Sequence, residues 1–228
     1  MIPIRDSVRS RRFPIMTVFI ILLNVLVFLH EISLSDPDRL ALFMRFGVVP
    51  SRISGVRMPE ASAFALTPLI SATFLHGSWL HIIGNMLFLW VFGDNVEDKM
   101  GRLRFLCFYL LVGIIANFTH VLANPASTVP TVGASGAVAG VLGAYFLLFP
   151  GARVLALVPV GIFVPIAEVP AFVFLFVWFL LQVFSGVASL GAAGQSVQAV
   201  AWWAHIGGFL SGMILLFPFL PAKSRTRR

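Results

Sequence analysis

Residues 105–123 read FLCFYLLVGIIANFTHVLA, an apolar stretch without a single Asp, Glu, Lys or Arg. A helix of about 20 residues crosses the hydrocarbon core of a bilayer. Working outward from this stretch, similar apolar runs recur at about 14–30, 75–93, 134–150, 170–188 and 199–220. We therefore predict an all-α membrane protein, a bundle of six transmembrane helices with a long, partly helical first external loop.

The composition leaves little chain for a separate soluble domain. Hydrophobic residues make up 59% of the 228 residues and charged residues 11%, whereas about a quarter of an ordinary soluble domain is charged. The apolar run behind the N-terminal arginines resembles a signal peptide, but no small-x-small cleavage site follows it, so we expect a retained helix. We predict three parts: a basic tail at 1–13, a membrane domain at 14–220 and a basic tail at 221–228.

The basic residues indicate which way the helices run. The net charge is +7, and twelve of the 16 Lys and Arg residues lie in the two tails and in the connections at 94–104 and 151–154. With six spans these segments share one side of the membrane, and the positive-inside rule makes that side the cytoplasm. Both termini are therefore predicted to be cytoplasmic. The charge is read as a topology signal, and no nucleic acid partner is expected.

Three further stretches are partly or mostly apolar but are not predicted to span the membrane. Residues 39–46 and 61–74 of the first loop mix apolar and polar side chains, and we expect interfacial helices there. Residues 154–169 are interrupted by Pro159 and Pro165. We place residues 154–169 at the cytoplasmic interface.

The second apolar run carries two polar side chains one helical turn apart, His81 and Asn85. At this spacing both point to the same side of a helix. One interpretation is an interhelical hydrogen-bonding pair that only stabilises the bundle, and the other is a functional site. Ser78 is the expected N-cap of this helix, and His76 is expected to lie off that face, near the loop.

A serine and a histidine stand at the starts of the fourth and sixth runs. Ser135 lies between glycines, which fits a helix cap in a closely packed region as well as a nucleophile. His205 would supply the base that a serine nucleophile needs. Each is followed by glycines four residues apart, which allow two helices to approach closely: Gly136, Gly140, Gly208 and Gly212.

Topology favours the catalytic interpretation. Helices two, four and six all run from outside to inside, so His81, Asn85, Ser135 and His205 share one depth on the outer side. Ser135 is then the predicted nucleophile and His205 the general base. His81, Asn85 and the backbone N–H of Ser135 would stabilise the oxyanion. Glu168 lies near the cytoplasmic face and the acids of 31–60 in a loop, so we predict a Ser–His dyad without an acidic third member.

At these residues the chain resembles the bacterial rhomboids, which are intramembrane serine proteases. The resemblance rests on the His-x4-His-x3-Asn run at 76–85, the Gly-x-Ser-Gly at 133–136 and the Ala-His-x-x-Gly-x-x-x-Gly at 204–212. It implies a six-helix rhomboid-like bundle that hydrolyses peptide bonds in or near transmembrane helices, with Ser135 and His205 as the dyad. It also implies that substrates enter between helices two and five, where candidate gate or lipid-facing residues are Phe88, Phe92, Phe176 and Trp178.

One position departs from the pattern of some family members. A tyrosine one turn after the nucleophile packs beneath the base in those proteins, and Ala139 stands there in this chain. What orients His205 is therefore open. Four other polar residues are predicted to make interhelical or interface contacts without a catalytic role: Asn24, Asn117, His120 and Gln182.

The remaining expectations follow from these. The histidines lack metal-ligand spacing, so neither a metal nor another cofactor is expected. The predicted partners are transmembrane protein substrates and membrane lipids, and the protein is expected to function as a monomer in a bacterial plasma membrane. Two alternatives stay open: an inactive relative that binds client transmembrane helices, and a transporter, which would need polar residues through both leaflets.

Overall fold

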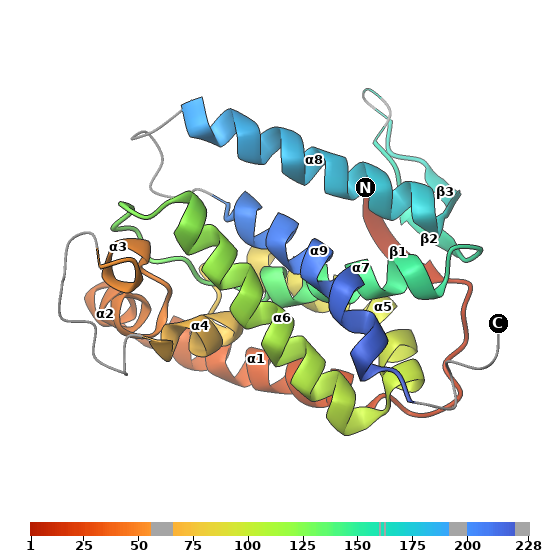
Figure 1. The fold of residues 1–228 in the computed structure, drawn as a ribbon, viewed down its shortest axis with the longest axis horizontal. Coiled ribbons are helices and arrows are strands. Elements are labelled where there is room, and N and C mark those ends of the chain that lie inside the picture. The colour runs from red at the N-terminus through yellow and green to blue at the C-terminus, as the bar shows by residue number, and fades with distance from the viewer. Residues whose placement is uncertain (56–65, 160, 162, 192–199, 222–228) are drawn as a thin grey trace.

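The computed structural model describes residues 1–55, 66–159, 161, 163–191 and 200–221. Six long helices dominate it (Figure 1), and each falls on one of the six predicted apolar runs: α1 (Ile15–Ser33), α5 (Trp79–Met100), α6 (Arg102–Ala123), α7 (Ser135–Leu148), α8 (Ala171–Gly191) and α9 (Trp202–Phe219). The predicted helical membrane fold is confirmed.

The six helices differ in how they can cross a membrane. Helices α1, α6, α8 and α9 are long and apolar enough to span by themselves. Helix α5 passes that test only together with the short helices before it, from which it is bent by 94°. Helix α7 has 14 residues, or about 21 Å, against a hydrocarbon core of about 30 Å. The chain is therefore a multi-pass integral membrane protein in which one helix is shorter than the predicted run.

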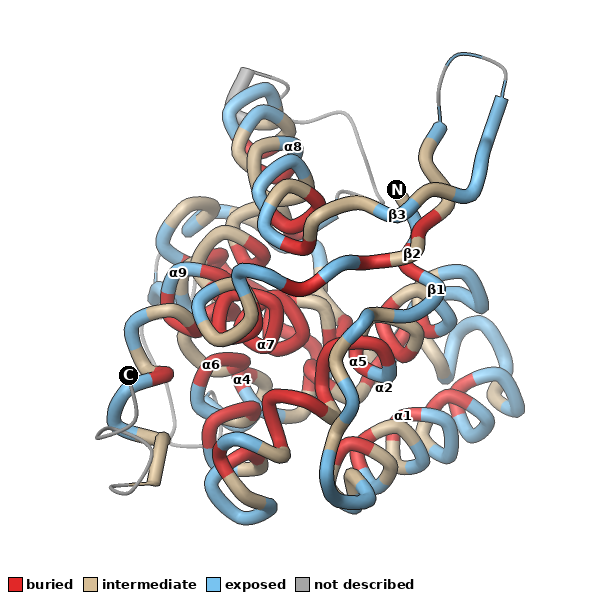
Figure 2. The backbone as a smooth tube through the Cα atoms, turned by 90° about the vertical axis from the view of Figure 1, so that its right-hand side faces the viewer, coloured by how far each residue is buried: buried red, intermediate tan, exposed pale blue. Residues whose placement is uncertain are grey.

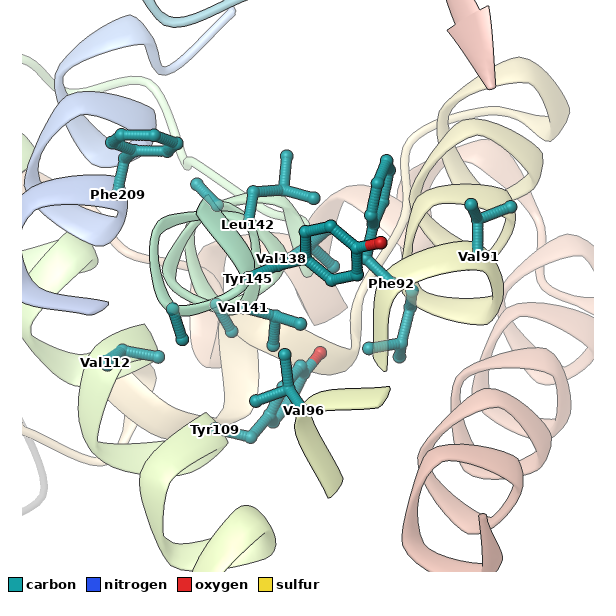
Figure 3. Packing of buried hydrophobic residues seen from close by; sticks show 14 of the residues in the cluster. Val91, Phe92, Val96, Tyr109, Val112, Val138, Val141, Leu142, Tyr145 and Phe209 are labelled. Carbon is teal, nitrogen blue, oxygen red and sulfur yellow. The ribbon is translucent and has the colours of Figure 1, made fainter. Parts of the chain in front are cut away.

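Helix α7 lies at the centre of the bundle. All residues from Gly136 to Tyr145 are buried, and Figure 2 shows this helix enclosed by its neighbours. Its small residues let α6 and α9 approach, and its larger ones pack against α5, where Phe92 and Tyr145 meet edge to face at 4.9 Å (Figure 3). Because α7 is buried over most of its length, apolar residues suit every face of this helix.

A small antiparallel sheet was not predicted. Strand β2 (Arg153–Leu157) lies between β1 (Ile2–Asp6) and β3 (Ile166–Pro170). The predicted basic tail at 1–13 thus contains a strand, and the segment at 154–169 is mostly a hairpin. Ile2 pairs with Leu157 and Asp6 with Val154. These pairs satisfy backbone groups that a loop would leave to water.

The first loop contains the predicted helix at 39–46 as part of α2 (Asp36–Phe46), whose first turn is capped by the Ser35 side chain. Three short elements follow: α3 (Pro50–Ile53), α4 (Pro68–Ser71) and the 3-10 turn η2 (Ala72–Phe74). Of the helix predicted at 61–74, residues 61–65 lie outside the described residues. So do 222–228 of the predicted C-terminal tail and most of the connection at 189–198.

Candidate active site

The starts of α5 and α7 meet at Gly133. Its N–H donates to the Ala72 carbonyl at 2.9 Å, and its φ of +135° is one that side-chain-bearing residues rarely adopt. A Cβ on Gly133 would lie 2.6 Å from Nε2 of His81 and 3.6 Å from Oγ of Ser135. His81 and Ser135 therefore border one small space, and only glycine leaves it open.

The starts of α7 and α9 meet through their glycines. A Cβ on Gly136 would lie 3.6 Å from the Cβ of Ala204. One turn further along, Gly208 faces the carbonyl of Gly136, and Gly212 faces that of Gly140, too closely to admit a side chain. Ser135 and His205 are the chain neighbours of Gly136 and Ala204. The structure thus brings the predicted nucleophile and base to adjacent positions on two tightly packed helices.

Ser135 is the first residue of α7, and no side chain caps this helix end. The first N–H groups of a helix have no partner inside it, and the helix dipole adds a partial positive charge there. An uncapped helix start beside a serine is suited to stabilising negative charge on a substrate oxygen. The irregular segment before α7 is packed against η2 through Gly133, which lets backbone polar groups exist at membrane depth.

His205 lies in the first turn of α9 and is 7% exposed. Its Nε2 is buried without a hydrogen-bond partner in the described part of the chain. Its Nδ1 lies 2.8 Å from Oε1 of Gln182 on α8. The rings of Trp178 and Trp202 flank it, each with its centroid 6.0 Å away.

Asn85 and His81 do share one side of α5, and both contact His76. The Asn85 amide nitrogen lies 3.0 Å from Nε2 of His76, and the rings of His76 and His81 meet edge to face at 5.0 Å. The prediction that His76 lies off this face is wrong, because the bend before α5 turns its ring back over the helix. Ser78 caps α5 as predicted, accepting from the His81 N–H at 3.3 Å.

Glu31 was predicted to lie in a loop and belongs instead to the last turn of α1. It is fully buried, and its two carboxylate oxygens accept the His76 N–H at 3.1 and 3.2 Å. The charge at the end of an apolar run suggested exposure, but the unpaired amide of His76 gives the carboxylate a buried partner. Among the described residues, the side-chain hydrogen bond of His205 goes to Gln182, and no salt bridge joins His205 to an acid.

Aromatic rings fill the junction of α5 and α8. Phe88 lies 6.2 Å from Phe174 and 6.4 Å from Trp178, and Phe92 lies 6.1 Å from Phe174. We call these four residues the aromatic junction. Three of the four residues named from the sequence as gate or lipid-facing belong to it, and Phe176 is exposed on the outer face of α8.

The four other polar residues discussed above differ in whether their partners lie in another element or in their own helix. Gln182 and Asn117 make interhelical or inter-element hydrogen bonds as predicted, and His120 contacts Thr131 of the following loop. The Asn24 amide donates to Ile20 within its own helix, so of the two kinds of contact predicted for Asn24, the interhelical hydrogen bond is not found in the described residues. Sequence reasoning missed that the partner of Gln182 is His205. Its only signal was an amide in a run that is otherwise apolar.

Comparison with known protein families decides the classification. The model of the rhomboid domain matches residues 63–222. The chain belongs to the rhomboid family. The match contains all of the helices that meet at Ser135 and His205, and of the described helices and strands it leaves out β1, α1, α2 and α3.

Curated rhomboids align with about two thirds of the chain. Rhomboid-like protein 11, chloroplastic, of Arabidopsis thaliana is 32% identical over 65% of the chain and 50% of its own length. The mouse presenilin-associated rhomboid-like protein, mitochondrial, is 30% identical over 67% of the chain and 38% of its length. Rhomboid protein 1, mitochondrial, of Saccharomyces cerevisiae is 31% identical over 70% and 44%. The chain thus spans half or less of each of these rhomboids.

Proposed function

We propose that this rhomboid is an intramembrane serine endopeptidase that hydrolyses peptide bonds in or near the transmembrane helices of membrane-protein substrates. The observation that carries the proposal is the close packing of α7 on α9, where Gly136 faces Ala204. Ser135 at an uncapped helix start and His205 are their chain neighbours, and Nε2 of His205 has no hydrogen-bond partner in the described residues. A base needs a free lone pair and a nucleophile needs a base within reach.

The reaction follows from these groups. Nε2 of His205 accepts the proton as Oγ of Ser135 attacks the carbonyl carbon, and the resulting oxyanion accepts hydrogen bonds from the N–H of Ser135 and from His81 and Asn85. The tetrahedral intermediate collapses, His205 protonates the leaving amine, and an acyl-enzyme remains. Water then attacks the ester with His205 again as base, which releases the acid and restores Ser135.

The surroundings of Ser135 support a route for substrate helices and an orientation of the protein in the membrane. We propose that transmembrane helices reach Ser135 between α5 and α8, through the aromatic junction. The distribution of Lys and Arg supports cytoplasmic termini and a site that opens to the outer face. Six helices packed in one bundle support a monomer, and we propose that it acts in a bacterial plasma membrane, surrounded by lipids.

One alternative is a rhomboid that binds client helices without cleaving them. The presence of both Ser135 and His205 argues against it, since a protein that only binds has no use for a serine and base held side by side. Both functions would bind a transmembrane helix at the aromatic junction, so only a measurement of peptide-bond cleavage separates them.

The test is cleavage of a fluorogenic transmembrane substrate by purified protein in liposomes, beside Ser135→Ala and His205→Ala. Thermal unfolding in detergent confirms that the three proteins are equally folded. We expect cleavage by the native protein and its loss, by at least about 10³-fold, in both variants. Equal cleavage by all three, or a folded native protein that binds substrate helices and cleaves none of a broad panel, would refute the proposal.

A further inference from the structure

Gln182 links a peripheral helix to the candidate base. It stands on α8, 6% exposed, and its side chain makes two contacts. The amide nitrogen donates to the backbone carbonyl of Trp178 at 3.0 Å. The amide oxygen lies 2.8 Å from Nδ1 of His205 on α9.

The first of these contacts determines the direction of the second. A carbonyl oxygen only accepts hydrogen bonds, so the group facing Trp178 must be the NH₂ of Gln182. The opposite orientation of the amide would set two acceptor oxygens against each other. The oxygen of Gln182 therefore faces His205, and because it cannot donate, Nδ1 of His205 must carry the proton.

A protonated Nδ1 determines the state of the other ring nitrogen. A neutral imidazole has one N–H, so Nε2 then holds a lone pair. This is the nitrogen that is buried without a partner in the described residues. Gln182 thus selects the tautomer in which the nitrogen free to act is the one able to accept a proton.

We propose that Gln182 is a positioning residue that holds His205 as its Nδ1–H tautomer, with Nε2 free to take the proton of Ser135. The proposal rests on the proposed function. It also supplies an orienting group where Ala139 provides only a methyl group. Gln182 does not touch the reacting atoms and acts through His205 alone.

An amide suits this role inside a membrane. A carboxylate in the same place would accept the same N–H, but an ionised side chain at membrane depth is costly. The neutral amide accepts from Nδ1 at no charge cost, and its second bond to Trp178 prevents it from turning. In the imidazolium form that follows proton transfer, Nδ1 keeps its proton and the same hydrogen bond remains.

The decisive variant is Gln182→Met, which keeps the length of the side chain and removes the acceptor. General base catalysis as a whole contributes about 10²–10⁴-fold, so we expect kcat to fall about 10- to 100-fold with KM within about twofold of the native value. Gln182→Glu is the conservative variant. In its neutral acid form it can accept from Nδ1 and donate to Trp178, and it should recover most of the lost kcat.

A matched control separates this role from the loss of any buried amide. Asn24 is also buried, and the hydrogen bond that its side chain makes among the described residues lies within α1. Asn24→Leu should leave kcat unchanged. If it lowers kcat as much as Gln182→Met does, or if Gln182→Met retains the native kcat, the proposal is wrong.

A spectroscopic readout is independent of activity. The ¹⁵N signals of the His205 ring, assigned by their loss in His205→Gln, distinguish a protonated from an unprotonated nitrogen. We expect a protonated Nδ1 and an unprotonated Nε2 in the native protein, and a mixture in Gln182→Met. Unchanged signals in that variant would overturn the role of Gln182, whereas absent cleavage by the native protein would refute the proposed function and leave this readout valid.

Discussion

Helices α7 and α9 meet backbone to backbone, whereas α5 and α8 meet through aromatic rings. Between α7 and α9, Gly208 and Gly212 lie directly against the carbonyls of Gly136 and Gly140. Between α5 and α8, ring centroids stay more than 6 Å apart, and no hydrogen bond joins the described parts of these two helices. The same bundle thus contains one contact with no free space between the backbones, α7–α9, and one that consists of spaced aromatic rings, α5–α8.

The difference separates two tasks. Backbone atoms in contact cannot turn aside, so the α7–α9 contact holds Ser135 and His205 at a constant spacing. Ring pairs keep most of their dispersion attraction as they tilt and slide, so we expect the contact between α5 and α8 to tolerate small shifts better than the α7–α9 contact. Gln182 connects α8 to the α7–α9 pair through its contact with His205. A displacement of α8 away from α9 would therefore also break the contact between Gln182 and the candidate base.

The largest expected effect comes from breaking the tight contact. Gly212→Ala places a methyl group against the Gly140 carbonyl, which has no free space to move into. We expect a loss of about 3 kcal/mol of stability, at the upper end of the cost of overpacking, measured by unfolding in detergent. Gly84→Ala is the control, because no atom lies within 4 Å of its Cβ position. Equal stability of the two variants would show that α7 and α9 separate easily.

A smaller effect is expected at the aromatic junction. Phe174 is fully buried between Phe88 and Phe92, while Phe176 on the same helix is half exposed. Lipid is as apolar as a ring, so removal of Phe174 loses packing and little hydrophobic transfer energy. We expect Phe174→Ala to cost about 1–2 kcal/mol in the same unfolding measurement, and Phe176→Ala close to nothing. A cost for Phe174→Ala as large as that of Gly212→Ala would remove the contrast between the two contacts.

The smallest effect concerns Asp6 of strand β1, which is hydrogen-bonded to one helix of each pair, α7 and α5. Its carboxylate accepts from the Tyr145 hydroxyl of α7 and from the Asn95 amide of α5 at 2.9 Å. Burial raises the pKa of Asp6 from 3.8 to about 6, aided by the nearby Asp94 and opposed by the Tyr145 hydrogen bond. The folded protein therefore binds this proton more tightly than the unfolded chain, and native stability falls as the pH rises from about 4 to about 6.

Asp6→Asn removes that dependence and keeps an acceptor for Tyr145. The variant should match the native protein near pH 4 and exceed its Tm above pH 6, by no more than about 2–4 °C because the group is partly solvated. Scanning fluorimetry across this pH range measures the difference. A difference between the two Tm values that stays level from about pH 4 to 6 would contradict the raised pKa of Asp6.

The features that could be predicted from the sequence are local. Apolar runs locate the six helices, Ser78 marks the start of α5, and the four-residue glycine spacings anticipate two helices in close contact. Each of these signals lies within one turn or one helix of the structure it describes. The length of α7 was overestimated because Phe149 continues the apolar run beyond the helix end at Leu148.

The features that could not be predicted depend on distant partners. Strand β1 is five residues with two charges, and only its pairing with β2 makes it a strand. Glu31 is buried because the bend before α5 offers it the His76 amide. The contact of Gln182 with His205 requires the rotational setting of α8 against α9, which apolar residues on every side of α8 leave unspecified.

The pairing of β1 with β2 also imposes an order on biogenesis. Residues 2–6 leave the ribosome well before their partner strand at 153–157, which follows only after the sequences of α1, α5, α6 and α7. At a synthesis rate of about 5–20 residues per second, the N-terminal strand waits about 7–30 s for its partner. During that interval its backbone is unpaired, so the sheet closes late in assembly and joins the first and later helices after their insertion.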